Sequence, residues 1–173
     1  MTWFFTADLH FDHTNIMKHC ERPWTKVEDM NQNLIENYNS VVKNSDNVVI
    51  AGDITLHTNR KIVEEKFLNR LNGNKIYLKG NHDYWLKEKR YLYHRNINGQ
   101  FIAVSHYPMR SWKNSTHGSW NLHGHSHGKL VPFENQYDVG VDNNNYFPIS
   151  FEQIKEIIKC QKNTQQIKSD KNF

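Results

Sequence analysis

At 173 residues the chain is long enough for one domain with a substantial hydrophobic core. Its formal net charge is +4, and residues 161–173 carry half of that excess (three lysines against one aspartate), so charge alone does not indicate a nucleic-acid partner. No apolar stretch approaches the ~20 residues that span a bilayer, and no basic stretch with an apolar signal core opens the chain. We therefore expect a cytoplasmic protein without a membrane partner.

Short apolar runs rich in β-branched and aromatic residues predict the strands. In chain order these runs are 3–5, 48–51, 75–78 and 101–104. The dipeptide Asn98-Gly99, just before the last of them, predicts a hairpin turn. The run at 120–122 lacks this composition and is not predicted as a strand. The early part of the chain favours parallel pairing and the later part antiparallel pairing, so we predict a mixed arrangement.

Apolar residues at helical spacing predict two helices before residue 75. The first covers residues 27–42, and Thr25 with Glu28 predicts a capping box at its start. The second carries its apolar residues over 62–71 and is expected to stop near Asn72-Gly73. Each helix has one apolar face, which is typical of a helix that packs on a sheet.

A final helix is predicted near the C-terminus. Ser150 and Gln153 form its expected cap, and the isoleucines of residues 154–158 form its buried side. The residues that follow are polar and bury little apolar surface, so we expect a poorly ordered tail. We therefore predict one domain over residues 1–160 and a tail over residues 161–173.

Five polar clusters follow apolar runs and supply oxygen or imidazole donors without any cysteine. They are Asp8-Leu9-His10, Gly52-Asp53, Gly80-Asn81-His82-Asp83, His106 and Gly124-His125-Ser126-His127. Because ligands of α/β sheets bind beyond the carboxyl ends of the strands, these clusters predict one convergent site. Within the first and the last cluster the donors alternate by two, so on a strand they would project from one face.

The donor set is larger than one tetrahedral zinc ion uses. Two carboxylates, one amide oxygen and four imidazoles suffice for two divalent ions if one carboxylate bridges them. The absence of thiolates favours manganese, iron or zinc. Paired metal ions about 3.5–4 Å apart can hold a hydroxide between them and clamp both oxygens of an in-line phosphoryl displacement. The donors therefore indicate a phosphoester hydrolase.

Each cluster also has an ordinary structural explanation when it is taken alone. A Gly-Asp after a strand is most often a turn, Asn81 fits a helix cap, and His82 fits a hydrogen-bonded core histidine. His106 fits the end of a strand, and residues 123–127 fit a surface loop. The order and spacing of all five clusters together favour the metal site.

In this order the clusters resemble the calcineurin-like metallophosphoesterase family, whose pattern runs Asp-x-His, Gly-Asp, Gly-Asn-His-(Glu/Asp), His and Gly-His-x-His. The resemblance covers residues 3–159. It implies an α/β fold in which two mixed β-sheets form a four-layer sandwich flanked by helices. It also implies one metal ion held by Asp8, His10, Asp53 and His127, and a second held by Asp53, Asn81, His106 and His125.

By the same resemblance, His82 lies beside the substrate phosphate, as its stabiliser or as the general acid for the leaving oxygen. Many family members place an acid three residues after the aspartate of Gly-Asp, where this chain has Leu56. Because an ionised partner favours the imidazolium form, this departure removes one support for the general-acid role. Asp83 and His57 are candidates to replace that acid.

Three further residues are candidates for contact with the phosphate, namely His13, Arg22 and Arg110, since arginine suits bidentate phosphate contact. Ordinary surface charge is the alternative explanation for each of them. The run over residues 8–16, followed by Arg22-Pro23, resembles a small bacterial and phage-type subgroup that usually acts on phosphodiesters.

The resemblance therefore implies a phosphodiesterase that hydrolyses a small or nucleotide-like phosphodiester by in-line attack of a metal-bridging hydroxide. Its expected cofactors are two divalent metal ions, manganese first, with iron, zinc or nickel as alternatives. A nuclease or phosphomonoesterase of the same fold is the alternative activity, and nucleic acid is not the favoured substrate. A metal-binding scaffold without catalysis ranks lowest, because His82 and every ligand are present. The sequence leaves the oligomeric state open.

Overall fold

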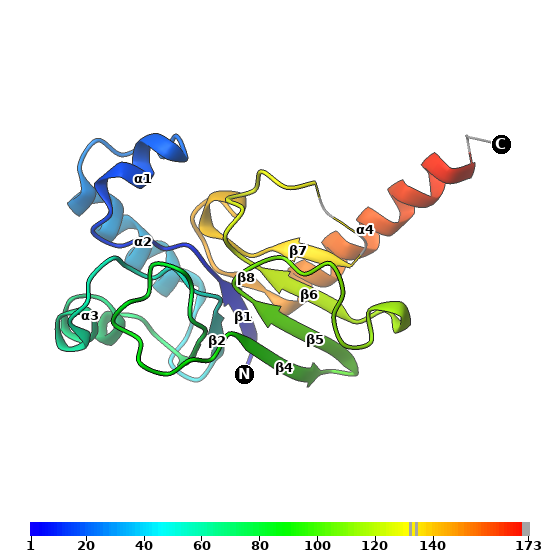
Figure 1. The fold of residues 1–173 in the computed structure, drawn as a ribbon, viewed down its shortest axis with the longest axis horizontal. Coiled ribbons are helices and arrows are strands. Elements are labelled where there is room, and N and C mark those ends of the chain that lie inside the picture. The colour runs from blue at the N-terminus through cyan, green and yellow to red at the C-terminus, as the bar shows by residue number, and fades with distance from the viewer. Residues whose placement is uncertain (132, 134, 171–173) are drawn as a thin grey trace.

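The computed structural model describes residues 1–131, 133 and 135–170, of which residues 162–170 are described by their backbone alone. Two four-stranded sheets face each other (Figure 1). Helices flank them, so the predicted arrangement of two mixed sheets with flanking helices is confirmed. Among the described helices, none is long and apolar enough to cross a membrane.

The first sheet is built from the early apolar runs, in the order β3-β2-β1-β8. Its strands are β1 (Trp3–Thr6), β2 (Asn47–Ile50), β3 (Asn74–Tyr77) and β8 (Ile149–Ser150). The first three pair in parallel as predicted, and β8 pairs antiparallel with β1. The apolar residues of β2 are fully buried, which is typical of a strand covered on both faces.

The second sheet contains the later strands, in the order β4-β5-β6-β7. They are β4 (Leu92–Ile97), β5 (Gln100–Ser105), β6 (Trp120–His123) and β7 (Gln136–Asp138). The predicted hairpin joins β4 and β5, and Asn98 and Gly99 both have positive φ, at 50° and 85°. β6 pairs in parallel with both neighbours. Within the second sheet the antiparallel prediction is therefore right only for the hairpin, and the run at 120–122 is a strand that the sequence did not predict.

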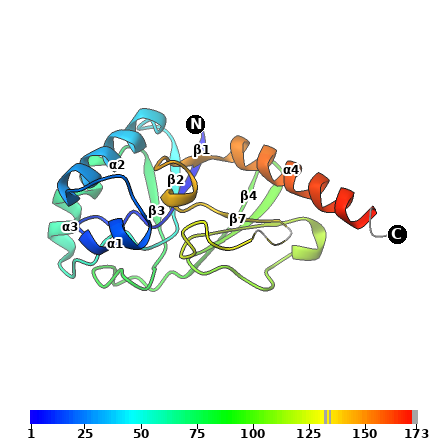
Figure 2. The same ribbon diagram turned by 90° about the horizontal axis from the view of Figure 1, so that it is seen from above.

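Three helices cover the outer face of the first sheet (Figures 1 and 2): α1 (Thr14–His19), α2 (Val27–Val41) and α3 (Arg60–Lys66). The predicted capping box of Thr25 and Glu28 is wrong, because α2 begins after Lys26 without a side-chain cap. The predicted second helix is shorter than expected. The backbone leaves the helix at Phe67, whose ring stacks on Phe11 with 4.5 Å between centroids.

The last helix, α4 (Phe151–Asp170), begins at the predicted cap. Gln153 N donates to Ser150 Oγ at 3.3 Å, and Ser150 N donates to Gln153 Oε1 at 2.9 Å, which closes the capping box. Phe151 stacks on Trp120 of the second sheet. The helix continues through residues 161–170, where we expected an unordered tail, and its end extends away from both sheets (Figure 1). Residues 171–173 lie outside the described residues, and the domain boundary at residue 160 stays a prediction.

Alternating strand residues separate two cores. Phe4 faces the helices α1 to α3, whereas Phe5 faces the second sheet and α4. The outer face of the second sheet is covered by the irregular segment between β5 and β6, where Met109 N donates to Asn121 Oδ1. The inner strands β1, β2, β5 and β6 are therefore mostly buried, whereas the edge strand β4 is largely exposed, and the polar clusters follow the strand ends.

Candidate metal centre

All five polar clusters lie just after the carboxyl end of a strand, and they converge. Three imidazoles surround the carboxylate of Asp53, which follows β2. Its Oδ2 lies 3.6 Å from His10 Nε2, 3.4 Å from His106 Nε2 and 3.8 Å from His82 Nε2. These distances are too long for good hydrogen bonds. They are short enough for the carboxylate and the imidazole nitrogens to bind the same cation.

The described residues contain two adjacent groups of donors that fit a metal ion. In each group the donor atoms lie within 4.8 Å of one another; one group is Asp8, His10 and His127, and the other is Asp53, His106 and His125. A third group, Cys20, His127 and Asp142, shares His127 with the first. Asn81 joins the second group, since its Oδ1 lies 2.9 Å from His106 Nε2. The structure thus brings together every residue that the sequence predicted as a ligand.

Two buried donor atoms in the first group, Asp8 Oδ1 and His10 Nε2, have no hydrogen-bond partner. Burial raises the pKa of Asp8 to about 7 and lowers the pKa of His10 well below its usual value. Leaving a buried carboxyl and a buried imidazole nitrogen unpaired is costly, and a divalent cation would satisfy both. The donor set therefore fits a metal ion.

Hydrogen bonds fix the orientation of two of the imidazoles. His106 Nδ1 lies 2.9 Å from Ala51 O, which can only accept, so Nδ1 carries a proton, and Nε2 faces the other donors, 2.9 Å from Asn81 Oδ1. His127 Nδ1 lies 2.7 Å from Asp142 Oδ2 in the same manner. Burial lowers the pKa of His127, but the bond to Asp142 outweighs this and raises it to about 10. A metal ion at His127 would therefore displace a proton.

The donors are carried by left-handed turns and not by strands. Five candidate ligands have positive φ: Asp8 (58°), His10 (51°), Asp53 (56°), His125 (68°) and His127 (48°). Such a conformation costs about 1–3 kcal/mol per residue and clusters at functional sites. The argument from strand alternation is therefore wrong in its geometry, because β1 ends at Thr6 and β6 at His123.

Two glycines allow the carboxylates to enter the site. A Cβ at Gly80 would meet Asp53 Oδ1 and lie 2.5 Å from Asp53 N, and a Cβ at Gly124 would lie 2.6 Å from Asp8 Oδ2. Real Cβ contacts are essentially never shorter than 3.0 Å. The glycines of Gly-Asn-His and Gly-His-x-His are thus required by close packing against the acids.

His82 stands at the open side of the site. Its side chain is 33% exposed, and its backbone N–H donates to Asp53 Oδ1 at 2.9 Å. His13 lies beside it, with 5.8 Å between ring centroids, and His13 Nδ1 is 3.2 Å from His10 Nδ1. The structure therefore places His82 and His13 together next to the candidate ligands, and their role toward a substrate stays a prediction.

The two candidate replacements for the missing acid are engaged elsewhere. The Asp83 carboxylate is fully buried and accepts the N–H groups of Asp53, Ile54, Gly80 and the Trp85 indole. His57 Nε2 lies 2.8 Å from Asp12 Oδ2. Leu56 itself is 38% exposed. Asp83 joins the turn at Asp53 to the turn at Gly80, so its role is to hold the backbone.

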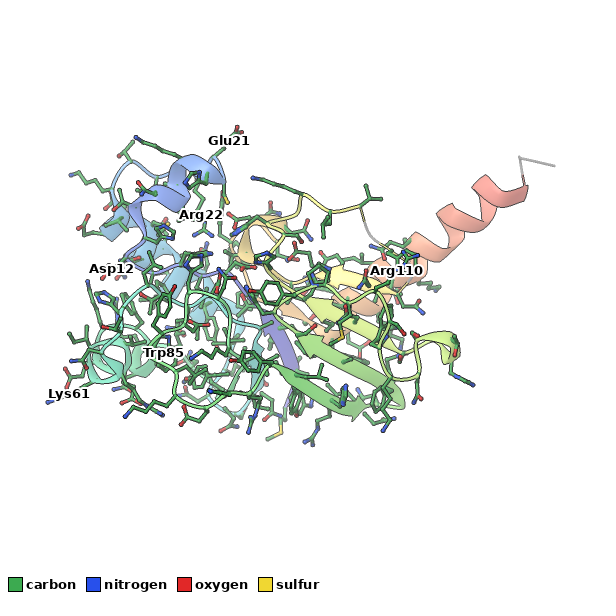
Figure 3. The ribbon with its side chains drawn as sticks, in the orientation of Figure 1. Asp12, Glu21, Arg22, Lys61, Trp85 and Arg110 are labelled. Atoms are coloured by element: carbon green, nitrogen blue, oxygen red, sulfur yellow. The ribbon has the colours of Figure 1, made fainter. Side chains whose placement is uncertain are left out.

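The prediction that Arg22 contacts the phosphate is contradicted by its surroundings. Its guanidinium is buried, and every N–H group has an acceptor: Asp142 Oδ1 and Oδ2, Asp8 O, Leu9 O and Met30 Sδ. Figure 3 shows Arg22 directed inward, whereas its neighbour Glu21 points outward. Arg110 is exposed, well away from Arg22 in that view, and its guanidinium lies 5.0 Å from the Phe133 ring centroid. The role of Arg110 stays a prediction.

Three residues at the site were missed by the sequence reasoning. Tyr107 is 49% exposed, and its ring packs on His125 at 4.5 Å between centroids. Cys20 and Asp142 each offer a donor atom within 4.8 Å of His127. Of these three residues, only Asp142 could have been recognised from the sequence. It follows β7 and two valines, just as Asp8 and Asp53 follow their apolar runs.

Facing mixed sheets with oxygen and imidazole donors at their strand ends define a metallophosphoesterase. The model of the family described as calcineurin-like phosphoesterase matches residues 1–170, and the chain belongs to this family. An uncharacterized protein of Methanocaldococcus jannaschii is 35% identical over 163 residues, which cover 90% of each chain. The crystal structure of a protein of unknown function from Aquifex aeolicus has a TM-score of 0.70 at 23% identity, covering 91% of this chain and 99% of that one. That likeness supports the fold alone.

Replacing Gly80 by alanine should displace Asp53, because the added Cβ collides with both its side chain and its backbone. We expect Gly80→Ala to fold, as judged by far-UV circular dichroism, but to bind Mn²⁺ about tenfold or more weakly in equilibrium dialysis. Gly99→Ala is the control, since its added Cβ meets nothing within 4 Å, even though Gly99 itself has a φ of 85°. Binding of Mn²⁺ by Gly80→Ala with wild-type affinity would contradict this assignment.

Proposed function

We propose that the protein is a phosphodiesterase that uses two divalent metal ions, manganese first, to hydrolyse a small or nucleotide-like phosphodiester. The observation that carries the proposal is the pair of adjacent donor groups that meet at the Asp53 carboxylate. When bound, two ions about 3.5–4 Å apart supply an activated water and neutralise charge on the phosphoryl oxygens. The cytoplasmic location expected from the sequence stays a prediction.

Asp53 would bridge the two ions. Its Oδ2 lies at similar distances from one imidazole of each group, 3.6 Å from His10 and 3.4 Å from His106. Although burial raises the pKa of Asp53, the neighbouring His106 imidazole and the hydrogen bond from the His82 backbone N–H bring it to about 2, so the carboxylate is ionised. Asp8, His10 and His127 would complete one position, and Asn81, His106 and His125 the other.

His82 would act on the substrate and not on the metals. Its imidazole is the part-exposed ring beside Asp53, and its backbone is fixed by the hydrogen bond to Asp53 Oδ1. From this position the ring can donate a proton to the leaving oxygen. His13, next to both His10 and His82, adds a second imidazole that faces the same region and can contact a non-bridging phosphate oxygen.

Charge favours a small substrate over a long polyanion. Half of the net charge of +4 lies in residues 161–173, which leaves a body with little excess positive charge. Arg22, a potential phosphate contact, is already paired with Asp142. A nucleic-acid duplex binds mainly through phosphate contacts with lysine and arginine, so a small diester is the better match.

A substrate comparison tests the proposal directly. With Mn²⁺ we expect bis(p-nitrophenyl) phosphate to be hydrolysed faster than p-nitrophenyl phosphate, and linear duplex DNA at the same salt to be degraded more slowly than the small diester. Chelation should abolish all turnover, and Asp53→Asn should be inactive. Faster degradation of DNA would identify a nuclease, faster hydrolysis of the monoester would identify a phosphomonoesterase, and either result would contradict the proposal.

Replacing His82 by alanine should separate catalysis from metal binding. We expect His82→Ala to retain its Mn²⁺ and to lose about 10²–10⁴-fold in rate, the usual contribution of a positioned general acid. The loss should be smaller for a p-nitrophenyl ester than for an alkyl or ribose ester, because p-nitrophenolate leaves without protonation. His94→Ala, on β4, is the matched control and should behave as wild type. Equal losses for both esters would show that His82 stabilises the phosphoryl oxygens instead.

A further inference from the structure

We propose that Arg22 and Asp142 form a positioning pair that holds His127 and the Asp8 turn in the geometry required for metal binding. The inference rests on the proposed function in one respect, that His127 and Asp8 are ligands of the same ion. Neither member of the pair belongs to the polar clusters of the sequence. The two residues are 120 positions apart and meet only in the folded chain.

The pair itself is buried and bidentate. Arg22 Nε donates to Asp142 Oδ1 at 2.7 Å, and Arg22 Nη2 donates to Asp142 Oδ2 at 2.8 Å. The Arg22 side chain is completely buried, and that of Asp142 is 6% exposed. Parallel hydrogen bonds fix the relative orientation of the two planar groups, so the pair joins the end of α1 to the turn after β7 as a rigid link.

Each member also holds one part of the site. Arg22 Nη2 donates to Asp8 O at 2.7 Å, and Nη1 donates to Leu9 O at 3.1 Å. Asp142 Oδ2 accepts from His127 Nδ1 at 2.7 Å. The link therefore runs from the backbone that carries one ligand to the imidazole of another, across the donor group of Asp8, His10 and His127.

The backbone of this region is strained, so it needs contacts that hold it in place. Asp8 and His127 both have positive φ, at 58° and 48°, a conformation that persists only where the surroundings enforce it. A carboxylate partner on a ligating histidine fixes the ring and its tautomer, and its loss typically weakens metal binding 10- to 100-fold. By contrast, the partner of His106 is a backbone carbonyl, which substitution cannot remove. The carboxylate partner of His127, Asp142, can be removed by substitution, so it allows such a test.

A purely structural role is the competing explanation, and the variants are chosen to separate the two. Removing one member alone leaves an unpaired buried charge, which destabilises a fold for reasons unrelated to metal. The double variant Arg22→Met with Asp142→Leu removes both charges together and should fold. Asp46→Asn is the matched control, because Asp46 is a buried aspartate that accepts two backbone N–H groups at the other end of the first sheet.

The measurement is Mn²⁺ binding by the full chain. It is made by equilibrium dialysis and by the increase in melting temperature when Mn²⁺ is added. We expect Arg22→Lys, Asp142→Asn and the double variant to bind one of two Mn²⁺ ions about 10- to 100-fold more weakly and to retain the other. Asp46→Asn should melt earlier but bind both ions normally. Wild-type Mn²⁺ affinity in a folded double variant would overturn the proposal, as would an equal loss in Asp46→Asn.

The same measurement distinguishes this inference from the proposed function. A wild-type chain that binds Mn²⁺ but does not hydrolyse phosphodiesters would contradict the proposed activity, and the effect of the pair on one Mn²⁺ ion would still hold. If the wild-type chain hydrolyses diesters and the double variant binds Mn²⁺ with wild-type affinity, only the positioning role is contradicted. A wild-type chain that binds no Mn²⁺, Fe²⁺, Zn²⁺ or Ni²⁺ would contradict both.

Discussion

The buried carboxylate of Asp53 stands between the two groups of candidate ligands, and the other parts of the site are arranged around it. It is removed from water and faces imidazole nitrogens of His10 and His106 from opposite groups. Burial alone would raise its pKa, and the His106 imidazole together with the backbone N–H of His82 lowers it by more than that. Its turn is held by Asp83, which accepts the backbone N–H of Asp53 and of Gly80. An acid fixed in this way can be shared by two cations without moving.

Presenting so many donors in one place requires backbone that is costly to form. Five candidate ligands adopt left-handed conformations, and the turns that carry them bond to one another beyond the strand ends, where Asp8 N donates to Gly52 O and His10 N donates to Asp53 O, both at 3.0 Å. The fold compensates with buried acids that accept backbone N–H groups and with Arg22, which donates to the carbonyls of Asp8 and Leu9. Asp8 Oδ2 in turn accepts His125 N at 2.9 Å, so the two donor groups also support each other.

Much of the site was predictable because a polar cluster after a buried strand is a local pattern. The hairpin at Asn98-Gly99 and the cap at Ser150 were predictable for the same reason. Long-range pairing was not. Arg22 looked like a phosphate ligand because nothing near it in sequence reveals Asp142, its partner in the folded chain. The parallel pairing of β6 was missed because it depends on the irregular segment that returns the chain between β5 and β6.

The central claim is that Asp53 is shared by two metal ions, and bound metal per chain measures it most directly. The wild-type chain and Asp53→Ala would be dialysed against Mn²⁺ and analysed by inductively coupled plasma mass spectrometry. The account predicts about two ions per wild-type chain and a loss at both positions in Asp53→Ala. His10→Ala should mainly weaken the position that it shares with His127. A fully occupied pair of ions in Asp53→Ala would contradict the account.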